Sequence, residues 1–115
     1  MPFSRGEVVL VLFPDSNLRT AKRRPALVVQ ADNLGAGLHQ TLVAMITSNL
    51  KRAGHPSRIL ISIATPDGRR SGLLTDSVIM ADNIATIRDV EVDRAIGSWP
   101  DMTSVDKALR HSFGL

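Results

Sequence analysis

The sequence predicts a mainly β fold, in which a small antiparallel barrel or sandwich is followed by one C-terminal helix. Short runs of β-branched and aliphatic residues recur over the first two-thirds of the chain, and Gly, Pro, Asp and Asn separate them. Apolar residues at helical spacing occur only near the end. The length of 115 residues suits a single domain, which we place at 1–115.

The expected strands follow from these runs. The first covers 7–13 (EVVLVLF), and a loop extends from Pro14 to Arg24. Further strands are expected at 25–30, 41–47, 58–63 and 77–81, with shorter extended pieces at 84–88 and 94–99. A turn is predicted at Pro66-Asp67-Gly68, and Asp82-Asn83 is expected to close the strand that precedes it.

A helix is expected only at the C-terminus. Thr103 can cap its first turn, and Gly114 suits its end because glycine tolerates the left-handed conformation found there. The apolar residues between them repeat at helical spacing: Val105, Ala108, Leu109 and Phe113. The runs at 25–30 and 41–47 are apolar on both faces, so this helix or a second subunit must cover the second face. We favour a second subunit and expect a homodimer.

The composition argues against several classes of protein. There are no cysteines, which excludes a disulfide scaffold and a thiolate metal site, and three dispersed histidines do not suggest a zinc cluster. No apolar run approaches the roughly 20 residues of a membrane helix. The N-terminus lacks the apolar core of a signal peptide. We therefore expect a cytoplasmic protein with no membrane segment and no metal or other cofactor.

Charge is distributed unevenly along the chain. Fourteen basic and eleven acidic residues give a net charge of +3. Residues 1–74 contain ten basic and four acidic residues and carry +6, whereas residues 75–115 carry −3. The basic part suits an anionic partner such as nucleic acid or an acidic peptide, and the alternative is a solvated surface of mixed charge. Tyrosine is absent and other aromatics are few, so a base-stacking platform is not expected.

Arg24 is the first candidate site residue. Pro25 biases Arg24 toward extended geometry, so its guanidinium can present a rigid fork of donors to a phosphate. Three basic neighbours would deepen the positive potential: Arg19, Lys22 and Arg23. The same residues are also typical of a solvated loop tip that binds no ligand.

Two further candidates lie at the ends of predicted strands. Thr47 ends an apolar run and is followed by Ser48 and Asn49. Hydroxyl and amide groups at a strand end can converge on a ligand, although Ser-Asn is also an ordinary turn. The carboxylate of Asp82 can bind an arginine, act as a base or cap the next turn.

In their order and spacing, these segments resemble the MazF/PemK family of toxins from bacterial toxin–antitoxin pairs. The matching segments, which extend from Arg5 to Phe113, are Arg5-Gly6-Glu7-Val8-Val9, KRRPALVV, the strand end MITS, DSVIMADNIATI and the C-terminal IGSWPDMTSVDKALRHSFGL. The chain departs from the family pattern at three positions. Leu10 stands where a tryptophan is common, Asn83 where a glutamine is usual, and Met80 where some members have an arginine.

The resemblance implies a homodimeric SH3-like or CcdB-like β-barrel that cleaves single-stranded RNA at short sequences without a metal. Attack of the ribose 2′-OH on phosphorus would leave a 2′,3′-cyclic phosphate and a 5′-hydroxyl. Arg24 and Thr47 match the family's catalytic arginine and threonine, and Asp82 matches the aspartate of its Asp-Gln pair. The residues expected to bind substrate are Asn17, Arg19, Lys22, Arg23, Ser48, Asn49 and Asp82.

The implied chemistry suits these side chains. The transition state concentrates negative charge on phosphoryl oxygens, which Arg24 and the hydroxyl of Thr47 can stabilise. Arginine stays protonated and is a poor general base, so we assign Arg24 chiefly to charge stabilisation and assign the base to no residue. A toxin also implies an antitoxin, whose disordered and acidic segment would fold across the basic groove. Two alternatives remain open: a CcdB-like toxin that poisons DNA gyrase, and an inactive barrel that only binds an acidic partner.

Overall fold

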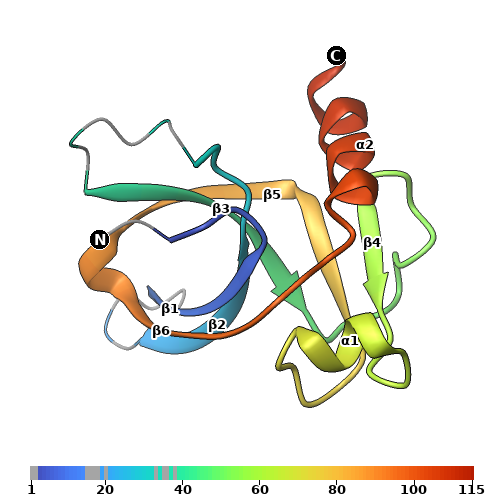
Figure 1. The fold of residues 1–115 in the computed structure, drawn as a ribbon, viewed down its shortest axis with the longest axis horizontal. Coiled ribbons are helices and arrows are strands. Elements are labelled where there is room, and N and C mark those ends of the chain that lie inside the picture. The colour runs from blue at the N-terminus through green and yellow to red at the C-terminus, as the bar shows by residue number, and fades with distance from the viewer. Residues whose placement is uncertain (1–2, 15–18, 20, 33, 35–36, 38) are drawn as a thin grey trace.

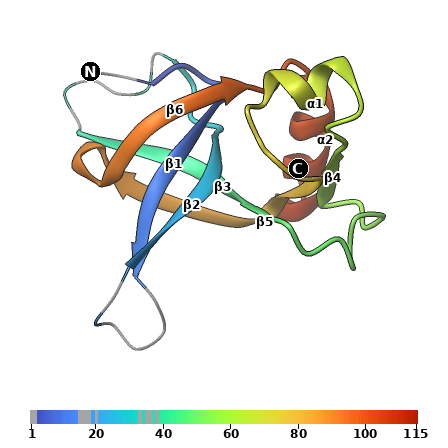
Figure 2. The same ribbon diagram turned by 90° about the horizontal axis from the view of Figure 1, so that it is seen from below.

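The computed structural model describes residues 3–14, 19, 21–32, 34, 37 and 39–115. Its elements are β1 (Glu7–Pro14), β2 (Ala21–Val28), β3 (Gln40–Thr47), β4 (Arg58–Ile61), α1 (Pro66–Arg70), β5 (Ser77–Arg88), a 3₁₀ turn at Asp89–Glu91, β6 (Val92–Ser98) and α2 (Met102–Phe113). All strand pairs are antiparallel, in the order β4-β5-β3-β2-β1-β6. The sheet is strongly curled, and α2 lies beside β4 and β5 at one end of it (Figures 1 and 2).

The predicted fold class is confirmed in its main features, because the chain is mainly β and ends in a helix. β4 and β6 are the edge strands of the sheet, and no pairing joins them within the described residues. A closed SH3-like or CcdB-like barrel therefore stays a prediction. Neither helix in the described part of the chain has the length and apolar sequence that crossing a membrane requires.

The side chains of the apolar runs form two buried clusters, one on each face of the sheet. The cluster under α2 consists of Val8, Leu27, Ala44, Ile46, Ile61, Ile79, Trp99 and Val105. The cluster on the opposite face consists of Val9, Val11, Ala26, Val28, Val43, Met45 and Ile87. Because α2 covers one face and the curled sheet surrounds the other, the strands that are apolar on both faces are buried within a single chain. The burial of these strands therefore does not require a second subunit. Of the two expected covers, the C-terminal helix accounts for one face of the sheet.

The loop predicted from Pro14 to Arg24 is wrong at its C-terminal end, because β2 begins at Ala21. The hairpin ladder between β1 and β2 continues through Val11 opposite Arg24 and on to Pro14 opposite Ala21. Pro25 is consequently inside the strand rather than its first residue. Pairing of β2 with β3 starts only at Ala26, so a proline is tolerated where β2 has an unpaired edge on that side.

The segments predicted at 77–81 and 84–88 form one strand, β5, and Asp82-Asn83 does not close it. β3 pairs Ala44 with Ile84 and Ile46 with Ile79, so β5 has extra residues between these two points. The extra residues make an irregularity at which the strand bends and continues. The polar pair is therefore the site of a bend within the strand, not a strand end.

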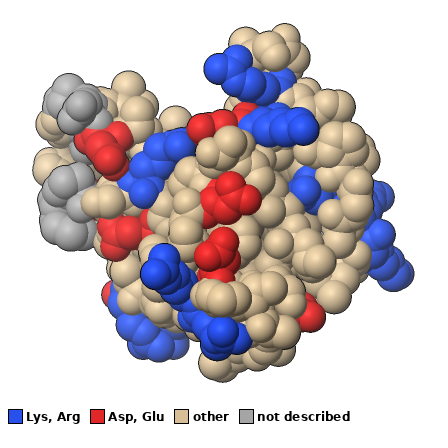
Figure 3. Space-filling model, turned by 45° about the vertical axis from the view of Figure 1, so that its right-hand side comes forward, with Lys and Arg blue, Asp and Glu red and all other residues tan. Residues whose placement is uncertain are grey.

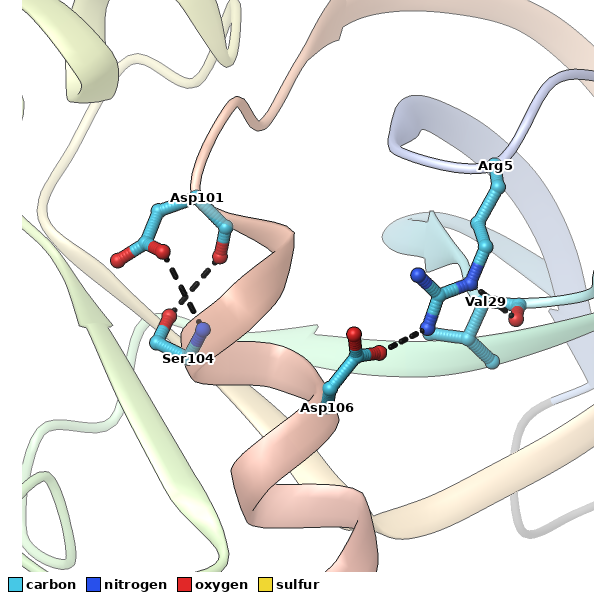
Figure 4. A network of polar contacts seen from close by, with 5 residues as sticks. All are labelled: Arg5, Val29, Asp101, Ser104 and Asp106. Atoms are coloured by element: carbon cyan, nitrogen blue, oxygen red, sulfur yellow. Dashed lines mark hydrogen bonds and ion pairs between the residues drawn. The ribbon is translucent and has the colours of Figure 1, made fainter.

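Both helices begin with a cap that the sequence analysis did not assign. The predicted turn at Pro66-Asp67-Gly68 is the start of α1, which Thr65 caps by accepting a hydrogen bond from the N–H of Gly68 at 3.0 Å. The cap of α2 is Asp101, not Thr103, and it accepts from the N–H of Ser104 at 3.2 Å (Figure 4). The predicted end of α2 at Gly114 is confirmed by its left-handed φ of 71°.

Arg5, just before β1, connects the start of that strand to α2 through polar contacts (Figure 4). Its Nε donates to the carbonyl of Val29 at 2.9 Å, and its Nη2 forms an ion pair with Asp106 of α2. The next residue, Gly6, has a φ of 95°, and its carbonyl accepts from the N–H of Trp99 at 2.8 Å. The Arg-Gly opening that supports the family resemblance thus joins the first strand, the end of β6 and the helix.

Gly97→Ala is expected to destabilise the fold. A Cβ at Gly97 would overlap the backbone of Arg70 and Ser71 at the end of α1, and backbone cannot rotate away. Overpacking of this kind costs about 1–3 kcal/mol. Gly54→Ala is the matched control, because no atom lies within 4 Å of a Cβ built there. Urea unfolding of both variants measures the difference, and equal stability of the two would contradict the close contact.

Candidate functional site

Arg24 and Thr47 lie at the same level of the sheet on neighbouring strands. The antiparallel ladder of β2 and β3 begins with Ala26 opposite Met45. Extending this register by two residues places Arg24 opposite Thr47. Because side chains alternate along each strand and opposite residues share a face, both residues face the same way as Met45. The two predicted catalytic residues are therefore brought together by strand register.

Both side chains line a groove of about 550 Å³, which we call the Arg24 groove. Its lining residues are Arg23, Arg24, Pro25, Met45, Ile46, Thr47, Ser48, Leu73, Thr75, Ser77, Met80 and Asn83. The groove combines two cations, several apolar side chains and several uncharged hydroxyl and amide groups. Cations bind phosphate, whereas apolar side chains and uncharged hydrogen-bonding groups together bind a flat heterocyclic base. The combination suits a nucleotide.

A turn after β3 holds the hydroxyl of Thr47 in place. Its Oγ1 accepts a hydrogen bond from the N–H of Asn49 at 3.1 Å, and the Oδ1 of Asn49 accepts from the N–H of Lys51 at 3.1 Å. Ser-Asn is thus an ordinary turn, and this turn also serves the site. Because the hydroxyl oxygen is engaged as an acceptor, its proton can be donated to an anion in the groove.

A second, smaller depression adjoins the Arg24 groove. We call it the Lys51 hollow; it has a volume of about 280 Å³ and is lined by Thr47, Asn49, Lys51, Arg52, Arg58 and Met80. Thr47 and Met80 line both the groove and the hollow, so a bound chain can pass from one to the other across them. The lining of the hollow includes three basic residues and no acidic one.

Asp82 lines a different depression from Arg24. Its carboxylate binds Arg58, whose Nε lies 2.9 Å from Oδ1 and whose Nη2 donates to Oδ2 at 3.2 Å. Together with His55 and His111, it lines a hollow of about 480 Å³ near the C-terminal end of α2. Of the roles open to Asp82 from its sequence, binding an arginine is the one the structure shows.

The environment of Asp82 shifts its titration. Burial alone would raise the pKa of the Asp82 carboxyl, but the hydrogen bond and the charge of Arg58 outweigh it. The backbone N–H of Asp82 and the side chain of Ser57 also favour the charged form. The pKa of Asp82 is therefore held below its ordinary value, and the carboxylate stays ionised at neutral pH.

The other residues predicted to bind substrate are distributed around the two depressions. Ser48 lines the Arg24 groove, and Asn49 lines the Lys51 hollow. Lys22 is exposed on β2, two residues before Arg24, and Arg19 is exposed in the connection from β1. Neither of these two side chains is part of the groove lining. Asn17 lies outside the described residues.

The match to a family model decides the assignment. A model described as a PemK-like, MazF-like toxin of type II toxin–antitoxin system matches residues 4–113. The chain belongs to this toxin family. Endoribonuclease MazF6 of Mycobacterium tuberculosis is 34% identical over 119 residues, and the match covers all of both chains. Endoribonuclease EndoA of Bacillus subtilis is 32% identical over 118 residues, which cover 100% of this chain and 97% of the relative.

Solved structures of MazF proteins share the fold of this toxin. A mycobacterial endoribonuclease in complex with its cognate antitoxin has a TM-score of 0.74 at 22% identity, covering 99% of this chain and 97% of that one. A MazE-MazF structure from Deinococcus radiodurans has a TM-score of 0.76 at 19% identity, covering 98% and 97%. The likeness extends over the whole toxin fold, including α2.

Several residues of the toxin's groove were not predicted as site residues. Asn83 was noted from the sequence only as a departure from the family pattern and Ser77 only as the start of a predicted strand, and Leu73 and Thr75 were not noted. For Asn83 a signal exists. If 77–88 is read as one strand, neighbouring side chains alternate, so Asp82 and Asn83 face opposite sides. The structure places them accordingly, with Asn83 in the Arg24 groove and Asp82 outside it.

On the face of the toxin drawn in Figure 3, the basic residues do not form one continuous patch. Figure 3 shows basic and acidic side chains interspersed on one face of the molecule. Three ion pairs each join an arginine of residues 1–74 to an aspartate of residues 75–115: Arg5–Asp106, Arg23–Asp93 and Arg58–Asp82. Much of the charge asymmetry along the sequence is thus compensated by folding.

Asp82→Asn is expected to make the free energy of unfolding depend less on pH in the acid range. A folded-state pKa below the ordinary Asp value of 3.8 stabilises the fold fully above that value, and this contribution is lost as pH falls through the folded-state pKa. The variant should be less stable than the wild type at neutral pH, and the two should converge in acid, where both side chains are neutral. Urea unfolding from pH 7 down to about pH 2 measures this. Asp67→Asn, at a half-buried acid with no described ion pair, is the control, and a difference that is constant over this range would contradict the assignment.

Proposed function

We propose that this toxin binds single-stranded RNA in the Arg24 groove and cleaves it there, with residues 1–115 acting as one toxin domain. The family and the curated relatives make it a MazF-type endoribonuclease toxin of a toxin–antitoxin system. The observation that supports the location of the site is that Arg24 and Thr47 line one groove, at positions that the register of β2 and β3, extended by two residues, sets opposite each other. Both residues match the catalytic positions that the family resemblance implies.

The proposed reaction needs no metal. The ribose 2′ oxygen loses its proton and bonds to phosphorus while the bond from phosphorus to the 5′ oxygen breaks. The 5′ oxygen takes up a proton, which leaves a 2′,3′-cyclic phosphate and a 5′-hydroxyl. The guanidinium of Arg24 and the hydroxyl proton of Thr47 stabilise the charge that develops on the non-bridging oxygens. The fixed backbone of β2 and the turn after β3 hold these donors in place before substrate arrives.

The uncharged part of the groove supports a base next to the cleaved bond. Pro25 and Met80 provide apolar surface, on which the faces of a base can pack. Thr75 and Asn83 are exposed and provide a hydroxyl and an amide that can donate to and accept from the edge of a base. These contacts give the enzyme a means of preferring one sequence over another.

We further propose that the toxin acts in the cytoplasm as a homodimer and is neutralised by a cognate antitoxin. The mycobacterial and Deinococcus structures with the same fold are complexes with an antitoxin or with MazE. Lys22 and Arg24 are both exposed and lie two residues apart on the same face of β2, and they favour an antitoxin with an acidic segment. Such a segment would block the entry of RNA phosphates to the groove.

Long single-stranded RNA incubated with the protein in EDTA is expected to yield discrete fragments. The fragments should end in a 2′,3′-cyclic phosphate, because the reaction uses the 2′-OH and no metal. Intact RNA together with inhibited supercoiling by DNA gyrase would instead support a CcdB-like poison. Intact RNA and active gyrase would support an inactive barrel that binds an acidic partner.

Arg24→Ala and Thr47→Ala are each expected to lower the rate of RNA cleavage by about 10²–10³, because each removes a donor to the transition state. Both variants should unfold at nearly the wild-type urea concentration, since neither side chain is part of a buried cluster. Thr47→Ser keeps the hydroxyl and should retain cleavage. Arg110→Ala removes a positive charge from the exposed side of α2 and serves as the charge control. Wild-type rates for both alanine variants would overturn the site.

A further inference from the structure

We propose that the Lys51 hollow is a second phosphate-binding subsite, in which Lys51 and Arg52 hold an RNA phosphate adjacent to the one at Arg24 and Thr47. The inference rests on the proposed function and extends it. Its first support is geometric: the hollow begins where the Arg24 groove ends, and the two share Thr47 and Met80. A chain whose reacting phosphate lies at Thr47 therefore continues directly into the hollow.

The second support is the charge available in the hollow. Lys51 and Arg52 are exposed, and neither forms an ion pair with any described residue. The side chain of Arg58 is only 12% exposed, and Asp82 binds it through both of its carboxylate oxygens. Arg58 is thus already neutralised, so it forms a wall of the hollow. The two exposed cations supply the charge that an anion would meet.

The third support is that hydrogen bonds order the loop carrying these cations. The N–H of Lys51 donates to the side chain of Asn49, and the carbonyl of Arg52 accepts from the N–H of His55 at 3.0 Å. Since the N–H of Asn49 donates in turn to the hydroxyl of Thr47, one hydrogen-bonded turn holds both the hollow and the site. Less of the binding free energy is then spent on ordering the loop.

Single-stranded RNA fits this arrangement better than an acidic peptide does. The hollow has no apolar side chain except Met80, so it offers little to the side chains of a folding peptide segment. A phosphate needs only charge and donors, which Lys51, Arg52 and the amide of Asn49 provide. The ligand class is therefore a phosphodiester that neighbours the cleaved one.

The test uses the double variant Lys51→Ala/Arg52→Ala and, as a matched control, Lys107→Ala/Arg110→Ala, which removes the same two charges from the exposed side of α2. Binding to 2′-O-methyl RNA, which lacks the attacking hydroxyl, is measured over a range of salt. Losing one phosphate contact should lower the slope of log affinity against log salt by about 0.7 in the Lys51 variant. The control should keep the wild-type slope.

Cleavage gives a second readout. The Lys51 variant should raise KM for long RNA about tenfold with little change in kcat, because the reacting phosphate still meets Arg24 and Thr47. The RNA is then shortened one nucleotide at a time from each side of the cut. The difference in KM between the wild type and the double variant should disappear at the step that removes the phosphate bound in the hollow. Lys51→Arg/Arg52→Lys, which keeps both charges, should restore most of the binding.

Two results would overturn the subsite. One is that Lys51→Ala/Arg52→Ala shows the same salt dependence of RNA binding and the same KM as the control Lys107→Ala/Arg110→Ala. The other is a double variant that binds RNA normally but loses affinity for an acidic antitoxin peptide, which would assign the hollow to the peptide. Failure of the proposed function is separate: wild-type protein would then cleave no RNA, while binding of 2′-O-methyl RNA still decides the subsite.

Discussion

The mismatch in length between β3 and β5 is the constraint on which the rest of the structure depends. Five steps along β5, from Ile79 to Ile84, face only two steps along β3, from Ala44 to Ile46. The surplus backbone lets β5 bend while it stays paired with β3 on one side and β4 on the other. The bend directs Met80 and Asn83 toward the Arg24 groove and Asp82 toward Arg58. One irregular stretch therefore separates the side chains that line the Arg24 groove from the one that faces the C-terminal end of α2.

Ion pairs explain why net charge is a poor guide to this surface. Each of three arginines from the basic part of the chain lies against an aspartate from the acidic part. The most exposed of them, Arg23–Asp93, is of the kind that contributes little to stability, about 0–1 kcal/mol. The ion pairs also change the charge map at the candidate site, because Arg23 lines the Arg24 groove and Arg58 lines the Lys51 hollow, and each is paired with an aspartate. Lys22, Lys51 and Arg52 stay exposed around the two depressions. The charge open to an anion is therefore smaller than the number of basic residues there suggests.

The sequence predicted the strand runs and the C-terminal helix, because those signals are local. It also singled out Arg24 and Thr47 through the family resemblance, and the structure places both in one groove, although their catalytic roles stay a prediction. It did not predict that Arg24 lies inside β2, since the hairpin ladder that extends the strand depends on a partner. The partnership of Asp82 with Arg58 was missed for the same reason: the two residues meet only because β4 pairs with β5. α1 was missed although Thr65 and Pro66 are good starting signals, because Gly68 and the short length suggest a turn.

The close contact between α1 and β6 has a consequence for how this toxin can vary. A Cβ at Gly72 would overlap the carbonyl of Ile96, and one at Gly97 would overlap the end of α1, so main chain lies directly on main chain. The segment that follows carries Leu73 and Thr75 to the Arg24 groove. It is held by this backbone contact, by the packing of Leu73 against the cluster under α2, and by the carboxylate of Asp76, which accepts from the N–H of Ile63 at 2.9 Å. Of the two side chains that reach the groove, Thr75 is exposed, so its identity can vary without disturbing the core. The path of the main chain beside the groove is set by the two glycines, and the chemistry of that wall of the groove can change independently of it.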